Sequence, residues 1–391
     1  MRRTILTLIV LLSVITTRAQ MFFGDSLNIS LLTAAPGVGA YERFGHTGIR
    51  VQDLKGGSDI VFHYGVYNYR EPNFVWHFVE GICNYRMGAN HASSFIEDYR
   101  ERGLQLTEQR LWLDSAQVQA MIATLIDNYQ PQNRNYRYNF FFDNCATRPY
   151  DLLTRFAMFD TAWIRPVTLR DMLQEKTNRN NWLDFGISLA IAGRADRQAS
   201  FREQMFLPDY LMEALRHASI DGHPLVAAES ELSPYAPAIA EEIENDCGGP
   251  FSPNVVCLIP MLFAWIMFLS KKLGRWTWAS SRTTANVFDT LLLLVTGLTG
   301  CILWFLNFFS EHPAVDNNVN CLLFLATNVL FAPIISIKKA EKVCRIYFFI
   351  IFAAEILYIV FVLVCAQYFN PAFLPLMICM ALRCYSRTFD R

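Results

Sequence analysis

The stretch that decides the fold runs from Phe140 to Leu153 and reads FFFDNCATRPYDLL. A strand-like aromatic run ends here, and Cys145 follows the pair Asp143 and Asn144. A free thiol is mostly protonated at neutral pH, but its pKa falls beside an imidazolium or a helix N-terminus. The thiolate is the species that attacks acyl carbonyl groups. Cys145 is therefore a candidate nucleophile.

An earlier stretch, Phe44 to Val51, reads FGHTGIRV and supplies the matching base, His46. The competing interpretation makes Cys145 a buried, unreactive thiol and His46 a turn residue that bonds to the backbone, which is the commoner fate of both residue types. The polar neighbours of both residues favour the catalytic interpretation. A third polar group normally orients the base of such a pair. Four candidates for an orienting or substrate-side role remain open: His63, Tyr64, Asp143 and Asn144.

The helix after Cys145 has an uncertain start because of Pro149. If Asn144 were its N-cap, the helix dipole would favour a thiolate. Pro149 would then lie inside the helix, where its ring opposes the carbonyl group four residues earlier. We therefore predict a start near Thr147 or Arg148, with Cys145 in the preceding turn.

Residues 1–19 have the pattern of a secretory signal peptide: a basic start, an apolar run from Ile5 to Ile15, and small residues at cleavage spacing. Residues 20–250 are then predicted to form one extracytoplasmic domain. Alternating patterns predict strands, and three- and four-residue periodicity predicts helices at 115–129 and 152–159. We expect an α+β domain with helices on one side of an antiparallel sheet, whose predicted strands are 28–33, 47–52, 60–64 and 136–142.

The segment Trp182 to Leu211 allows two interpretations. It could be a loop with two helical pieces that close the domain. Alternatively, it forms an amphipathic rim whose arginines meet phospholipid head groups while its apolar residues touch acyl chains. The first interpretation is favoured, since charged loops are ordinary.

Residues 251–391 have the composition of a membrane domain with about five helices. The loops that are rich in lysine and arginine alternate with loops that have none. The positive-inside rule therefore predicts five crossings, a cytoplasmic C-terminus and an extracytoplasmic catalytic domain. The apolar segments are 255–270, 287–309, 321–337, 346–367 and a shorter one at 372–382.

Two acids lie within these apolar segments. Asp289 is near an end and is expected to be harmless, whereas Glu355 is a candidate for a packed polar contact or for a head-group or ion site. The spacing of cysteine and histidine residues fits no zinc site, and a bridge between Cys83 and Cys247 stays open. The formal net charge is −1. We predict no metal, no cofactor and no nucleic-acid partner.

In order along the chain, FGHTGIRV, YGVYNY, FVEG, DNCATRPYDLL and GRADRQ through EQMFLPDYL resemble the permuted papain-like domain of NlpC-type and lecithin:retinol acyltransferase-like enzymes. With a signal peptide and a multi-pass tail, the whole chain resembles the Lnb-type lipoprotein N-acyltransferases of Bacteroidota. Pro149 departs from the expected nucleophile segment. The resemblance implies Cys145 as nucleophile and His46 as base, with a phospholipid acyl donor and a diacylated lipoprotein acceptor at the inner membrane.

Three other classes stay open. A cell-wall peptidase or amidase would use the same pair on a peptide stem, although one span would suffice to anchor it. A phospholipase or thioesterase would pass the acyl group to water. A non-enzymatic membrane scaffold would follow if Cys145 and His46 lay far apart.

Overall fold

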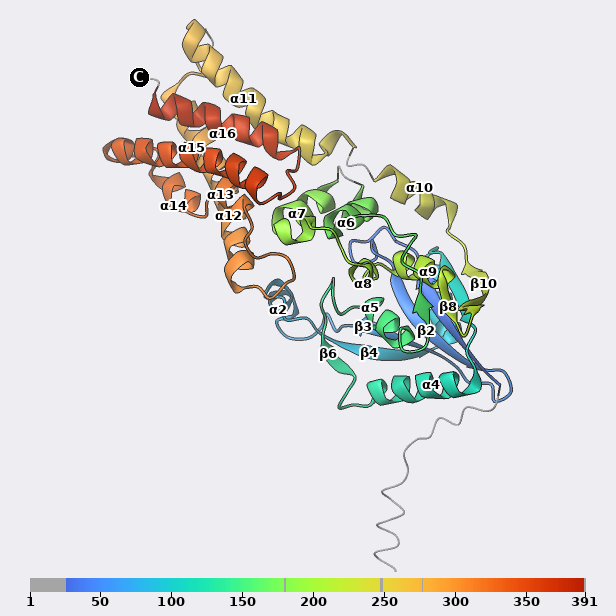
Figure 1. Cartoon of the computed structure of the whole chain (residues 1–391). Coiled ribbons are helices and arrows are strands. Elements are labelled where there is room, and N and C mark those ends of the chain that lie inside the picture. Colours follow the sequence, from blue (N-terminus) through green and yellow to red (C-terminus); the bar gives the residue numbers. More distant parts are fainter. Residues whose placement is uncertain (1–25, 179–180, 247–248, 276, 390–391) are drawn as a thin grey trace, which may run out of the picture.

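The computed structural model describes residues 26–178, 181–246, 249–275 and 277–389 (Figure 1). The predicted signal peptide and Cys247 lie outside the described residues, so the cleavage site stays a prediction and a Cys83 to Cys247 bridge stays open. An N-terminal α+β domain is followed by a helical region at the other end of the molecule, as the sequence predicts.

A seven-stranded antiparallel sheet organises the N-terminal domain, in the order β10-β5-β1-β2-β3-β4-β6. The first three strands lie where alternation predicts them. The last predicted strand is much shorter than expected, because only Asn135–Arg137 pairs with β4. The strands are β1 Leu27–Ala34, β2 His46–Asp53, β3 Asp59–Val66, β4 Asn84–His91, β5 Leu106–Leu111, β6 Asn135–Arg137 and β10 Val226–Ser233. A small second sheet contains β7 Met158–Phe159, β8 Ala218–Ile220 and β9 His223–Pro224.

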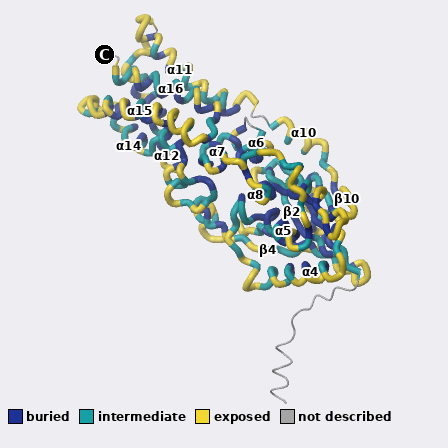
Figure 2. Tube along the Cα trace, in the orientation of Figure 1, coloured by how far each residue is buried: buried dark blue, intermediate teal, exposed yellow. Residues whose placement is uncertain are grey.

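Both faces of the large sheet are covered, which differs from the predicted one-sided arrangement. On β1, Ile29 and Leu31 join the core beneath α4, α5 and α9, whereas Leu32 and Ala34 point to the opposite face, beneath α3. Figure 2 shows the buried residues concentrated around these strands. The helices of this domain are α2 Phe74–Val79, α3 Ala92–Glu101, α4 Ser115–Tyr129, α5 Thr147–Leu153, α6 Leu169–Thr177, α7 Trp182–Ala190, α8 Phe201–Gln204, α9 Pro208–Arg216 and α10 Pro237–Asn245.

Two helix predictions have different outcomes. The helix at 115–129 is α4, and a capping box at Asp114 and Gln117 fixes its start. The helix predicted at 152–159 is wrong, because α5 ends at Leu153 and Met158–Phe159 instead pairs with the distant strand β8. A pairing between residues so far apart in the sequence overrides the local periodicity.

The helical region contains three helices among the described residues that are long and apolar enough to cross a membrane; they contain α11, α12 and α15. The third predicted span is not one helix but a series of short pieces, and the last segment forms the 16-residue α16. The number of crossings therefore stays a prediction. The elements are α11 Pro253–Leu273, α12 Arg282–Phe309, α13 Asn320–Leu323, α14 Asn328–Phe331, α15 Glu341–Val364 and α16 Phe373–Thr388.

Of the two acids predicted within apolar segments, Asp289 differs from expectation, and the role of Glu355 stays open. Asp289 is fully buried, and its carboxylate accepts hydrogen bonds from Arg383 at 2.6 and 3.0 Å and from Arg387 at 2.6 Å. It is thus the centre of an internal ion-pair cluster that joins α12 to α16. Glu355 is buried on α15, and neither of its carboxylate oxygens has a hydrogen-bond partner among the described residues.

The N-terminal domain is fixed to the helical region through α7. Asn318 donates to the carbonyl groups of Leu189 and Ala190 at 2.7 and 3.1 Å, and Asn320 donates to those of Ser188 and Leu189 at 3.0 and 3.1 Å. These amides satisfy carbonyl groups that the end of a helix leaves unpaired. Of the two interpretations of Trp182 to Leu211, the structure favours the first, in which helical pieces close the domain. The apolar side of α7 packs on the membrane helices, while Arg194, Arg197 and Arg202 pair with acidic residues of the protein.

Candidate active site

Two histidines and an asparagine from three neighbouring strands form a hydrogen-bonded chain. His46 is the first residue of β2, His63 lies on β3 and Asn90 on β4. The distance from His46 Nε2 to His63 Nδ1 is 3.0 Å, and that from His63 Nε2 to Asn90 Oδ1 is 2.9 Å. Both imidazole rings also contact Phe95 of α3. His63 therefore takes the orienting position beside His46.

This chain defines where each proton lies. The amide oxygen of Asn90 can only accept, so it places a proton on His63 Nε2. His63 Nδ1 then accepts from His46 Nε2–H, and the lone pair of a neutral His46 is left on Nδ1. His46 Nδ1 is accordingly the nitrogen that is free to accept a proton, because Nε2 is bonded to His63.

Cys145 sits in the turn before α5, which begins at Thr147. Pro149 falls in the first helical turn, where its missing N–H costs nothing, as predicted. Asn144 builds this turn: its Oδ1 accepts from the N–H groups of Ala146 and Thr147 at 2.9 Å each, and its Nδ2 donates to two carbonyl groups at 2.8 Å. Asn144 thus shapes the backbone around Cys145, and a substrate-side role for it stays a prediction.

In the structure, Cys145 lies beside Thr47, the residue that follows His46. The backbone N–H groups of Thr47 and of Cys145 itself are directed at the thiol. On the other side lies Gly65, whose positive φ of 89° belongs to an irregular end of β3. A Cβ atom at Gly65 would lie 4.0 Å from the Cys145 Cβ. The contact between the thiol and the His46 imidazole itself stays a prediction.

Burial makes the resting groups neutral. It raises the pKa of the Cys145 thiol to about 11, although the Thr47 and Cys145 N–H groups act in the opposite direction. Burial, with the adjoining His63 and the charge of Arg102, lowers the pKa of His46 to about 3. At neutral pH the site therefore holds a thiol and an uncharged imidazole, and the proton must move as the nucleophile attacks.

The remaining predicted candidates have structural partners elsewhere. Asp143 forms a two-pronged ion pair with Arg148 at 2.5 and 2.8 Å, which holds the nucleophile turn against α5. Tyr64 lies in the core, and its hydroxyl oxygen accepts from Asn128 at 2.9 Å. Neither touches His46 through a hydrogen bond in the described part of the chain. The sequence does not reveal Asn90, because β4 has little alternation to mark it as a strand.

The pKa values predict the pH dependence of Cys145 alkylation. Because the thiolate reacts and the thiol pKa is about 11, the rate with iodoacetamide should rise about tenfold per pH unit between pH 7 and pH 10. Peptide mass spectrometry of Cys145 after timed labelling would measure it. A rate that stays level from pH 5 to pH 8 would instead show a resting thiolate–imidazolium pair and contradict the neutral assignment.

Substitution of His63 should lower kcat more than substitution of Asn90, because His63 bonds to His46 directly and Asn90 does not. We expect His63→Ala to lower kcat about 100-fold, because His46 loses the acceptor that fixes its tautomer. Asn90→Ala should lower kcat about tenfold, since Asn90 is exposed and acts through His63. Asn90→Asp keeps an acceptor and should restore most of the rate. If Asn90→Asp were as slow as Asn90→Ala with unchanged stability, the orienting role would be wrong.

An α+β domain with a cysteine beside a histidine chain, mounted on membrane-length helices, defines a multi-pass membrane protein whose soluble part carries a candidate cysteine site. A sequence model of the Lnb N-terminal periplasmic domain matches residues 19–200, and one of the Lnb transmembrane domain matches residues 252–390. The chain therefore belongs to the Lnb family, with its N-terminal domain in the periplasm. No curated protein and no solved structure matches it.

Proposed function

We propose that the protein is a lipoprotein N-acyltransferase that carries a fatty acyl group from a membrane phospholipid on Cys145. His46 Nδ1 takes the thiol proton, and the sulfur attacks the ester carbonyl. The ester C–O bond breaks, His46 returns the proton to the departing oxygen, and a lysophospholipid leaves a thioester on Cys145. No cofactor or metal is needed for these steps.

The second half-reaction regenerates the thiol. The free α-amino group of a diacylglyceryl-cysteine lipoprotein attacks the thioester carbonyl while His46 accepts one amine proton. The C–S bond breaks, an amide forms, and the proton passes to the Cys145 sulfur. In both half-reactions the Thr47 and Cys145 N–H groups would stabilise the negative carbonyl oxygen, since they already point at the reacting sulfur.

The observation that supports the proposal most is the position of Cys145 beside Thr47 and the His46–His63–Asn90 chain, in a domain fixed to membrane helices. Two substrates confined to one bilayer gain effective concentration from such an arrangement. We place the helical region in the inner membrane with a cytoplasmic C-terminus. Lys271 and Lys272 end α11, and Lys338 and Lys339 precede α15, at the end of the region away from the catalytic domain (Figure 1).

The deciding experiment uses the full-length protein in phospholipid vesicles with a synthetic diacylated lipopeptide. Mass spectrometry should show one added acyl group on the lipopeptide and an equal amount of lysophospholipid. A lipopeptide with an acetylated α-amino group is the matched control and should gain none. Free fatty acid without lipopeptide acylation would identify a phospholipase or thioesterase, and cleavage of peptidoglycan stem peptides would identify the peptidase alternative.

A further inference from the structure

The short helix α2 follows β3, which carries His63, and precedes β4, which carries Asn90, along the chain. This helix exposes apolar side chains. Val75, Trp76 and Phe78 are 73%, 53% and 49% exposed, and α2 has no buried residue. Aromatic side chains with such exposure are costly in water, and a contiguous set of them marks a surface that meets another apolar phase.

The helix is fixed against the end of α12 that faces the catalytic domain (Figure 1). The rings of Trp76 and Phe305 are 5.2 Å apart. Two hydrogen bonds join the end of α2 to the residues that follow α12. Ser310 Oγ donates to the Val79 carbonyl at 2.9 Å, and the Glu311 N–H donates to the Glu80 carbonyl at 2.8 Å. The exposed face of α2 is therefore continuous with the surface of a membrane-length helix.

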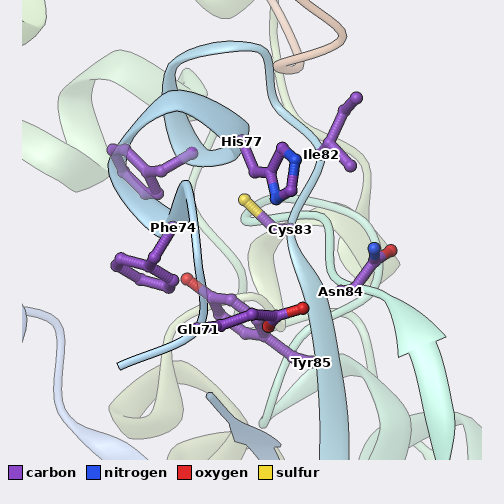
Figure 3. Close-up of a pocket in the computed structure, with 8 residues that line it drawn as sticks. Glu71, Phe74, His77, Ile82, Cys83, Asn84 and Tyr85 are labelled. Carbon is purple, nitrogen blue, oxygen red and sulfur yellow. The ribbon is translucent and has the colours of Figure 1, made fainter. Parts of the chain in front are cut away.

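A row of aromatic rings leads from α2 towards the nucleophile. Ring centroids are 5.6 Å apart between Phe74 and Tyr67, 5.2 Å between Tyr67 and Tyr85, and 4.7 Å between Tyr85 and Tyr138. Figure 3 shows the start of the row, where Phe74 and Tyr85 line one pocket together with Cys83.

The far end of the row reaches the active site. A Cβ atom at Gly65 would lie 3.4 Å from the Tyr138 ring and 4.0 Å from the Cys145 Cβ. Tyr138 is thus separated from the nucleophile by a residue without a side chain. The aromatic row ends where the acyl carbonyl group must be placed.

We propose that an acyl chain of the donor phospholipid leaves the bilayer at α2 and lies along Phe74, Tyr67, Tyr85 and Tyr138 to bring its ester to Cys145. This inference rests on the proposed acyl transfer and names its lipid-binding path. An acyl chain is the occupant that fits, because the path begins on the surface of a membrane helix and offers it a continuous row of aromatic rings up to Cys145. The acyl chain leaves an apolar bilayer, and contact with the aromatic rings keeps its methylene groups out of water on the way to Cys145.

The test compares a lipid donor with a small soluble one. Tyr67 is suitable because it is 41% exposed and lies outside the hydrophobic core clusters of the domain. We expect Tyr67→Ala to slow the acylation of Cys145 by phospholipid vesicles about tenfold or more. Its acylation by soluble p-nitrophenyl acetate should change less than twofold. Trp112→Ala, a 56% exposed ring at the end of β5, is the matched control and should change neither rate.

A second measurement does not depend on catalysis. A photo-crosslinking benzoylphenylalanine in place of Val75 should yield phospholipid adducts by mass spectrometry, whereas one in place of Met158, which is 78% exposed, should yield none. Equal adducts at both positions, an unchanged phospholipid rate in Tyr67→Ala, or an equal fall with both donors would overturn the path. If Cys145 accepted no acyl group from phospholipid while Val75 still gave lipid adducts, the proposed reaction would fail and the lipid-binding surface would stand.

Discussion

The Cys145→Ala variant should lose N-acylation by at least about 10⁴-fold, because no other group in the site can form the thioester. In a host that lacks its own N-acyltransferase, the N-terminal peptides of lipoproteins should stay diacylated by mass spectrometry. The unaltered protein, given phospholipid without an acceptor, should carry an acyl group on the Cys145 peptide that hydroxylamine removes.

The control for this result is a cysteine distant from the site. Cys301 is exposed on α12, so Cys301→Ala should insert into the membrane and acylate lipoproteins at the normal rate. Triacylated lipoproteins in cells that express Cys145→Ala would refute the thioester mechanism. Loss of activity in both variants would point to folding rather than chemistry.

Removing the imidazole base should be nearly as damaging as removing the nucleophile. With a thiol pKa of about 11, very little Cys145 is ionised at pH 7, so His46→Ala should lower kcat by at least about 10³-fold. The rate should be read from the acylated lipopeptide in the vesicle assay. Added imidazole should restore part of the rate, since the substitution leaves a space next to the acceptor nitrogen of His63.

The double variant tests whether the two residues act as one unit. Cys145→Ala with His46→Ala should be little slower than Cys145→Ala alone, because either loss disables the same step. A further fall of 100-fold or more in the double variant would show that His46 has a separate role, and the proposed proton transfer would have to be abandoned.

The local sequence pattern predicted those strands and helices whose side chains alternate or repeat regularly along the chain. Strands β1, β2 and β3 alternate between the two faces of the sheet, and α4 has a regular apolar stripe, so all four were found. The start of α5 followed from the backbone limits of Pro149. His46, Cys145 and His63 stand out by residue type and context; in the structure His63 bonds to His46, and Cys145 lies beside Thr47.

Long-range pairing accounts for what the sequence did not predict. Asn90 reaches His63 because β4 pairs with β3, a partnership that the polar sequence of β4 does not reveal. Asp289 is buried together with its ion-pair partners Arg383 and Arg387. These partners lie about a hundred residues further along the chain. In each case the missing information was the identity of a distant neighbour, which neither composition nor periodicity encodes.

The hydrogen bonds from the amides of Asn318 and Asn320 to the end of α7 also fix the distance between the N-terminal domain and the helical region. In the proposed reaction, a domain held in this way would keep Cys145 at a fixed height above the lipid surface, and its substrates would have to reach that height. The proposed lipoprotein acceptor would then need an extended segment after its acylated cysteine, because a folded body directly behind it would collide with the N-terminal domain.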